Sequence, residues 1–105
     1  MEKKYAFLLM GSDYDPETDQ AVFIKKAGSG GGESGTYLYT VRDFEEACRL
    51  AVKLKEEGFG AIELCGAFGK EKAEQITQLT GNTVAVGYVI HEPELDPLFQ
   101  AFFGG

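Results

Sequence analysis

The hydrophobic residues of this chain fall in short runs of strand length, separated in the second half by segments of helical periodicity. Residues 5–10 form a continuous apolar run that stops at a Gly-Ser pair, a pattern typical of a strand buried on both faces. Further runs, most of them rich in β-branched and aromatic residues, predict four more strands. These strands are expected at residues 21–24, 36–41, 61–65 and 83–90.

A helix is predicted between the third and fourth strands. Its apolar residues recur every three or four positions and give one inward face: Val41, Phe44, Cys48, Ala51 and Leu54. Thr40 and Asp43 resemble a capping box at its start, although Asp stands where Glu or Gln is usual. Gly58 provides the left-handed residue that ends it.

Two further helices are expected in the C-terminal half. One spans residues 70–80, with Ala73, Ile76 and Leu79 facing inward. The other is short and starts at Asp96-Pro97, since Asp is a good N-cap and Pro suits the first helical turn.

The order of these elements, β-β-β-α-β-α-β-α, predicts an α/β fold of mixed type with a single sheet of about five strands and helices packed on it. Crossovers through helices are right-handed and connect parallel strands, so the C-terminal half is a parallel βαβ arrangement. The glycine-rich residues 28–35 predict a flexible loop that joins an antiparallel hairpin in the N-terminal half. We expect a single domain over residues 1–105.

Composition and charge narrow the classes of function. Of 105 residues, 44% are apolar and 26% charged, as in ordinary globular domains. The formal net charge of −7 argues against binding to nucleic acid or to anionic membrane surfaces, which require clustered Lys and Arg. Two cysteines are too few for a disulfide scaffold, and no segment resembles a signal peptide or a transmembrane helix. We therefore expect a cytoplasmic protein with free thiols.

The turn between the fourth strand and the second long helix is the main candidate for ligand binding. It consists of Gly66, Ala67, Phe68, Gly69 and Lys70. Free backbone N–H groups and the positive end of the helix dipole face outward at such a turn, at the edge where open α/β sheets bind ligands. We hypothesise that the protein binds a small anionic metabolite or phosphate at residues 66–70. The same glycines also suit a tight turn that binds nothing.

Cys65 and His91 form a candidate catalytic pair, because each follows a strand that ends at this same edge. Thiols near a helix N-terminus ionise more readily, and a nearby histidine can act as base or acid. The alternative hypothesis is therefore a small enzyme that uses Cys65 and His91. A half-buried cysteine and a surface histidine without catalytic roles are the simpler interpretation, and two such ligands do not form a closed zinc site.

Two other motifs have simpler explanations. Residues 30–35 match G-x-G-x-x-G, but a strand follows them, so no helix N-terminus faces a phosphate. Four acidic residues alternate as calcium ligands do: Asp13, Asp15, Glu17 and Asp19. An EF-hand would need glycine at Thr18 and glutamate at Ile24. We expect solvated loops in both places and no metal site.

The C-terminal helix is rich in aromatic residues. Its apolar positions are Leu95, Leu98, Phe99, Ala101, Phe102 and Phe103. A helix turns only about 100° of its surface toward its own core, and soluble monomers seldom expose large aromatic patches. We therefore expect a homodimer, with completion of the chain's own core as the other explanation. A ligand-free structural or interaction protein acting as a homo-oligomer is the third hypothesis.

The chain as a whole resembles a family of small uncharacterised prokaryotic domains of about this length. The resemblance rests on the run at 5–10, the turn at 63–69 and the strand at 87–91, and it covers nearly the whole chain. It implies a bacterial or archaeal source and, because that family has no known activity, it identifies no functional residue. The unit from Phe59 to Ile90 also looks like a piece of a (β/α)₈ barrel, which needs more than twice this length.

Overall fold

The computed structural model of the chain describes residues 3–26 and 32–104. The strands are β1 (Lys3–Met10), β2 (Ala21–Lys26), β3 (Glu33–Val41), β4 (Ala61–Leu64) and β5 (Ala85–Tyr88). The helices are α1 (Phe44–Glu56), α2 (Gly69–Leu79), the 3₁₀ helix η1 (Pro93–Leu95) and α3 (Asp96–Phe103). The predicted order β-β-β-α-β-α-β-α is confirmed, with η1 added before the last helix.

The five strands form one mixed sheet in the order β2-β3-β1-β4-β5. β1 lies in the middle and runs parallel to both β3 and β4, and β5 is parallel to β4. β2 pairs antiparallel with β3 at the edge. The predicted α/β fold, with an antiparallel hairpin and parallel strands in a single sheet, is therefore confirmed.

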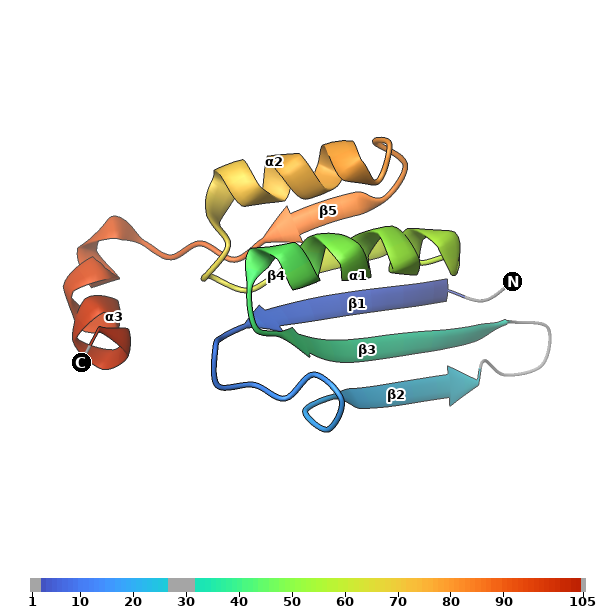
Figure 1. Ribbon diagram of the computed structural model, residues 1–105, viewed down its shortest axis with the longest axis horizontal. Coiled ribbons are helices and arrows are strands. Elements are labelled where there is room, and N and C mark those ends of the chain that lie inside the picture. Colours follow the sequence, from blue (N-terminus) through green and yellow to red (C-terminus); the bar gives the residue numbers. More distant parts are fainter. Residues whose placement is uncertain (1–2, 27–31, 105) are drawn as a thin grey trace.

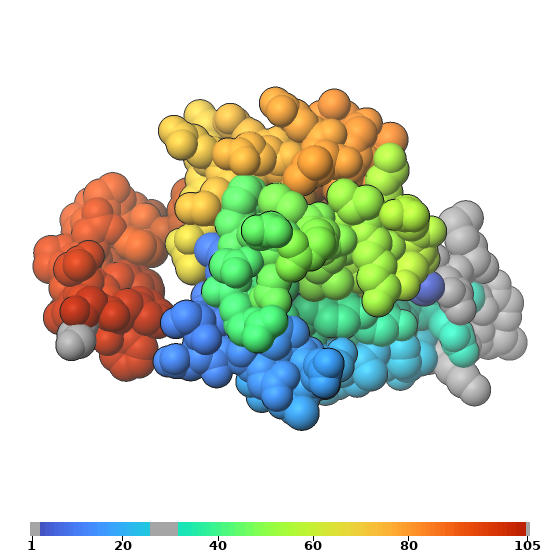
Figure 2. All heavy atoms as spheres, in the orientation of Figure 1, coloured from blue at the N-terminus to red at the C-terminus, as the bar shows by residue number. Residues whose placement is uncertain are grey.

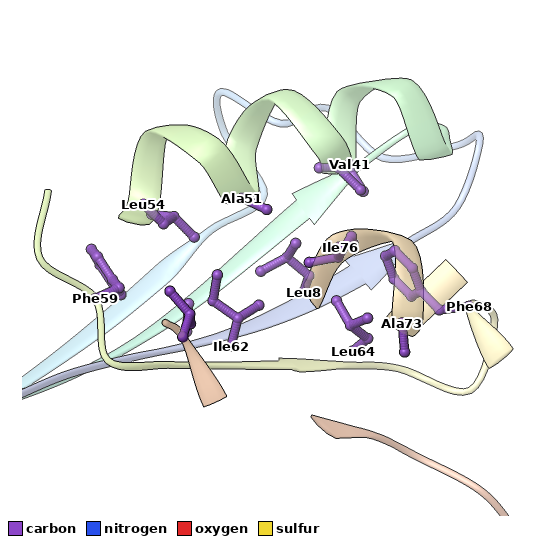
Figure 3. Packing of buried hydrophobic residues seen from close by; sticks show 13 residues of the cluster. Leu8, Val41, Ala51, Leu54, Phe59, Ile62, Leu64, Phe68, Ala73 and Ile76 are labelled. Carbon is purple, nitrogen blue, oxygen red and sulfur yellow. The ribbon is translucent and has the colours of Figure 1, made fainter. Parts of the chain in front are cut away.

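Helices α1 and α2 cover the same face of this sheet (Figure 1). The reason is topological: β3, β4 and β5 follow one another in a single direction across the sheet. Right-handed crossovers that progress in one direction place their helices on one side. The space between helices and sheet holds the core, which Figure 3 shows from close by. It is built from small and branched residues with almost no exposed surface, among them Ala6, Leu8, Ala51, Leu54, Ile62, Leu64 and Ile76.

The opposite face of the sheet carries no helix within residues 3–26 and 32–104. Alternation along β1 places Ala6 and Leu8 on the helix side, where neither has exposed surface. Tyr5, Phe7 and Leu9 lie on the other side and are partly exposed. The prediction that residues 5–10 are buried on both faces is therefore wrong for the single chain, because both crossovers deliver their helices to the same side.

The start of α1 is stabilised by reciprocal hydrogen bonds. The Asp43 carboxylate accepts from the backbone N–H of Glu46 at 2.9 Å, and the Glu46 carboxylate accepts from the backbone N–H of Arg42 at 2.7 Å. The predicted pairing of Thr40 with Asp43 is wrong, since Thr40 belongs to β3 and donates its hydroxyl to the Asp19 carbonyl. The cap is Asp43 with Glu46, one turn later in the chain.

The bounds of β3 and β5 and the burial of Leu79 differ from the predictions. β3 starts at Glu33, so residues 33–35 of the predicted glycine-rich loop are strand, while residues 27–31 lie outside the described part of the chain. β5 covers residues 85–88 rather than 83–90. Leu79 is 49% exposed instead of inward, and Thr80 is buried in its place. Thr80 follows Ala73 by two full turns, whereas Leu79 is rotated from Ala73 by about 120°.

α3 lies beyond the end of the sheet and forms a lobe separate from the body of the molecule (Figures 1 and 2). None of its eight residues is buried. Leu98, Phe102 and Phe103 are 68%, 79% and 76% exposed. Asp96 is the first residue of α3 and Leu95 is its N-cap, so the predicted start is displaced by one residue. In the part of the chain that the structure describes, no helix is long and apolar enough to cross a bilayer.

The cap of α1 makes stability depend on pH. Hydrogen bonds from the Arg42 side chain and backbone lower the pKa of Glu46 from 4.5 to about 2. A carboxylate with a lowered pKa in the folded state stabilises the fold above its unfolded pKa, and this contribution is lost as the pH falls toward about 2. We expect Glu46→Gln to lower the urea midpoint at pH 7, with the difference from wild type shrinking between pH 5 and pH 2.

Glu56→Gln is the matched control, because Glu56 lies at the other end of the same helix, near the negative end of its dipole. It should leave the midpoint unchanged or raise it slightly. Urea unfolding followed by circular dichroism measures both variants. A Glu46→Gln defect that is equally large at pH 7 and pH 2 would contradict the role of the ionised carboxylate.

Candidate anion site at the amino terminus of helix α2

The carboxyl ends of β1, β3, β4 and β5 meet at one edge of the sheet, since all four strands are parallel. The turn from β4 to α2 starts at this edge. Cys65 donates its backbone N–H to the Leu8 carbonyl at 3.0 Å, which attaches the turn to the central strand. Phe68 N–H then bonds to the Cys65 carbonyl at 3.1 Å, and Gly69 has a φ of +79°, a left-handed conformation that favours glycine.

The first turn of α2 has no side-chain cap. Phe68 occupies the N-cap position and cannot accept a hydrogen bond from the helix N–H groups. Backbone N–H groups at the start of a helix have no partner within the helix, and the dipole is positive there. In α1 the Asp43 carboxylate accepts a hydrogen bond from one of the equivalent groups, the Glu46 N–H. The start of α2 is therefore available to an external acceptor.

This helix start opens onto a surface depression of about 380 Å³. Phe44 and Phe68 form its apolar wall, with ring centroids 6.4 Å apart and the rings edge to face. Lys70, Lys72 and Gln75 supply polar groups. Glu71 also lines the depression and opposes the charge of the lysines.

The two lysines are held differently. The Lys72 ammonium lies 5.8 Å from the centroid of the Phe44 ring, which keeps this charge beside the depression. The Lys70 ammonium is 4.0 Å from the Glu74 carboxylate and is largely exposed. An exposed pair at this distance contributes little, so Lys70 can turn toward a ligand at small cost.

Only some of the predicted site residues 66–70 lie at the depression. Gly69 and Lys70 lie at the depression, whereas Gly66 and Ala67 are exposed residues of the turn outside it. Phe68 is 4% exposed and its ring belongs to the core as much as to the depression. Lys72 and Gln75 were missed, although Lys72 follows Phe68 by four residues and Gln75 follows Lys72 by three, spacings that place all three on one helix face.

Cys65 and His91 each have other partners. Cys65 is half-buried, and its sulfur accepts the backbone N–H of Met10 at 3.4 Å. The His91 ring stacks on Phe99 with centroids 4.0 Å apart and bonds to the Asp96 carboxylate at 2.5 Å. Among the described residues no hydrogen bond joins Cys65 to His91. The enzyme hypothesis stays a prediction.

The acidic loop between β1 and β2 uses its carboxylates on its own backbone. Asp15 accepts from Glu17 N–H at 3.1 Å, and Asp19 accepts from Asp15 N–H at 2.8 Å. These bonds shape the turn. Within the described ranges, no group of three or more His, Cys, Asp and Glu side chains is arranged to hold a metal ion.

A second depression, of about 370 Å³, lies between this loop and α1. Arg49 and Lys53 line it together with Glu17 and Glu46. Arg49 is already paired with Glu45 at 2.7 Å. Charges of both signs cancel there, and the first turn of α1, whose Glu46 lines this depression, is already capped by Asp43. The depression at α2 is therefore the better candidate for an anion site.

Comparison with known proteins places these residues in a family. The model of a family of unknown function, DUF6506, matches residues 3–104. This match confirms the resemblance to an uncharacterised domain family. No curated protein and no solved structure matches the chain.

Proposed function

The chain belongs to this family, DUF6506, whose function is unknown, and we propose from its own residues that it binds a small anion at the amino terminus of α2. The observation that carries the proposal is the uncapped first turn of α2, which opens onto a depression beside two lysines. Backbone N–H groups and a helix dipole suit a phosphate or a carboxylate.

The volume and lining of the depression limit the size and chemistry of the ligand that it can hold. A volume of about 380 Å³ is at the lower end of small-molecule pockets and suits a compact molecule. The Phe44 and Phe68 rings give it one apolar wall, so a carboxylate or phosphate with a short apolar part fits better than a bare ion. The depression is open to solvent, and the chain carries a net charge of −7. Both features point to weak binding, with a Kd in the millimolar to high micromolar range.

Amide NMR tests this proposal through titration with inorganic phosphate and, separately, with acetate at matched ionic strength. We expect the amides of residues 69–72 to shift in a saturable way. Lys72→Met should raise the apparent Kd about fivefold, because it removes one charge worth roughly 1 kcal/mol near the anion.

Lys55→Met is the matched control, since Lys55 lies near the opposite end of α1 from Phe44 and the depression. It removes the same charge from the chain and should leave the Kd within about twofold. Amides 69–72 that stay unshifted at about 10 mM phosphate and acetate would contradict the anion site, because that concentration exceeds the weakest Kd expected.

A second function, self-association into a homodimer, is favoured by a different observation. α3 presents large apolar side chains to solvent and buries none of them. Exposed aromatic patches of this kind are typical of interaction sites. Phe99 and Phe103 stack with centroids 6.3 Å apart, and Phe103 meets Phe102 edge to face at 4.9 Å, so the rings form one continuous surface.

Light scattering coupled to size exclusion at physiological salt tests this second function on the full chain. We expect the wild type to have the mass of a dimer and Phe102→Ser/Phe103→Ser to have the mass of a monomer, because the serines remove most of the aromatic surface. Leu79→Ser is the control, since Leu79 is an exposed apolar residue on α2. It should remain dimeric. A wild type that stays monomeric at high micromolar concentration would rule out self-association.

A further inference from the structure

We propose that α3 docks on the uncovered face of the sheet in a second copy of this chain, and that the second copy returns the same contact. We call this surface the open sheet face and define it by Tyr5, Phe7 and Leu9 of β1, Leu38 of β3 and Phe23 of β2. The proposal rests on self-association, the second function above, and assigns it two complementary surfaces.

The open sheet face is a mainly apolar surface in the middle of the sheet, bordered by the exposed Glu63 of β4, which pairs in register with Phe7. Strand register places Phe7 beside Leu38, and Tyr5 beside Thr36, which in turn pairs with Phe23. Paired residues of neighbouring strands point to the same side. Phe23 is 63% exposed, and Tyr5, Phe7, Leu9 and Leu38 are partly exposed. β1 thus has the continuous apolar sequence of a fully covered strand but only one covered side.

The apolar face of α3 is similar in size to the open sheet face. Its large residues fall at the spacings of one helix face: Leu95, Leu98, Phe99, Phe102 and Phe103. Eight helical residues extend about 12 Å. Three neighbouring strands span about 10 Å at their usual spacing, so one copy of α3 covers the centre of one open sheet face.

We call residues 89–103, which follow β5 and end in α3, the arm. The arm points away from its own sheet (Figure 1). His91 attaches α3 to the segment that precedes it, by stacking on Phe99 and bonding to Asp96. Pro93 and Pro97 restrict the backbone on both sides of that contact. These contacts hold residues 91–99 together as one unit, so α3 reaches its own sheet only if the chain turns back between the end of β5 and His91.

The two surfaces carry charges of opposite sign. The chain has no Lys or Arg after Lys72, and the arm carries Glu92 and Glu94. On the sheet, Lys3 and Lys25 both pair in register with Ser34, so they lie together on the open side at the amino-terminal edge. Opposite charges on the two surfaces favour their association and oppose the repulsion between two chains of net charge −7.

The area is sufficient for a stable dimer. Phenylalanines bury about 150–250 Å² each, and the exposed parts of Leu98, Phe99, Phe102 and Phe103 in two copies therefore amount to on the order of 800 Å². The sheets lose a comparable area, which gives about 1,600 Å², the size of an ordinary specific interface.

Two neighbouring residues of β2 provide a matched test. Phe23 and Val22 are 63% and 51% exposed and lie on opposite sides of the same edge strand. We expect Phe23→Lys to raise the dimer Kd at least about tenfold, as loss of an aromatic anchor does. Val22→Lys adds the same charge on the helix side and should change the Kd less than about twofold. Sedimentation equilibrium measures both, with circular dichroism to show that each variant is folded.

Mixing experiments distinguish this arrangement from pairing of α3 with α3. A chain with Phe102→Ser/Phe103→Ser keeps an intact sheet, and a chain with Leu38→Lys/Phe23→Lys keeps an intact arm. Each should be monomeric alone, and their mixture should form a heterodimer through the one contact that remains. Helix-to-helix pairing predicts no heterodimer, because only one member of the mixture has an intact α3.

The outcomes distinguish docking of α3 on the open sheet face from self-association by another surface. A dimeric wild type that is insensitive to Phe23→Lys and yields no heterodimer overturns docking on the open sheet face and leaves self-association standing. A monomeric wild type overturns both. Monomers in which Phe102→Ser/Phe103→Ser alters the amide shifts of β1 and β3 would show that α3 docks on its own sheet.

Discussion

The right-handedness of crossover connections determines which surfaces this chain buries. β3, β4 and β5 follow one another in one direction across the sheet, so α1 and α2 have to lie on the same side. Doubly wound folds avoid this outcome by reversing direction, which places helices on both faces. Here the connection in the other direction, from β1 to β3, passes through the edge strand β2 and not through a helix. The side chains on the second face of β1 therefore remain without a helix to cover them in the described residues.

The same constraint sets the place of the candidate site. Because the four parallel strands end at one edge, the β4–α2 turn brings the start of α2 there, and the packing of α1 against α2 on their shared face sets Phe44 beside Phe68. Phe68 stands at the N-cap, where a polar residue would normally satisfy the helix N–H groups. The Phe68 ring packs in the core, and the consequence is a helix start without a side-chain cap.

Much of the fold follows from local sequence signals, whereas the features that depend on contacts between distant segments do not. The strands, the order of elements and the end of α1 at Gly58, with φ at +90°, were predictable from apolar runs, periodicity and a left-handed glycine. The burial of β1 on one side only was not, because its run of apolar residues looks the same whether the covering layer comes from its own chain or from another. Residues 66–70 located the turn correctly, but Lys72 needed the helical phase and Phe44 needed the packing of α1 on α2.

An isotope-filtered NMR experiment shows directly whether the second face of the sheet is covered by the helix of another copy. Chains labelled with ¹³C are mixed with unlabelled chains, and an isotope-filtered NOE spectrum records only contacts between different chains. We expect cross-peaks from the methyl groups of Leu9 and Leu38 in labelled chains to the ring protons of phenylalanines in unlabelled chains. Leu9 and Leu38 methyl groups that give NOEs only to protons of their own chain would contradict it.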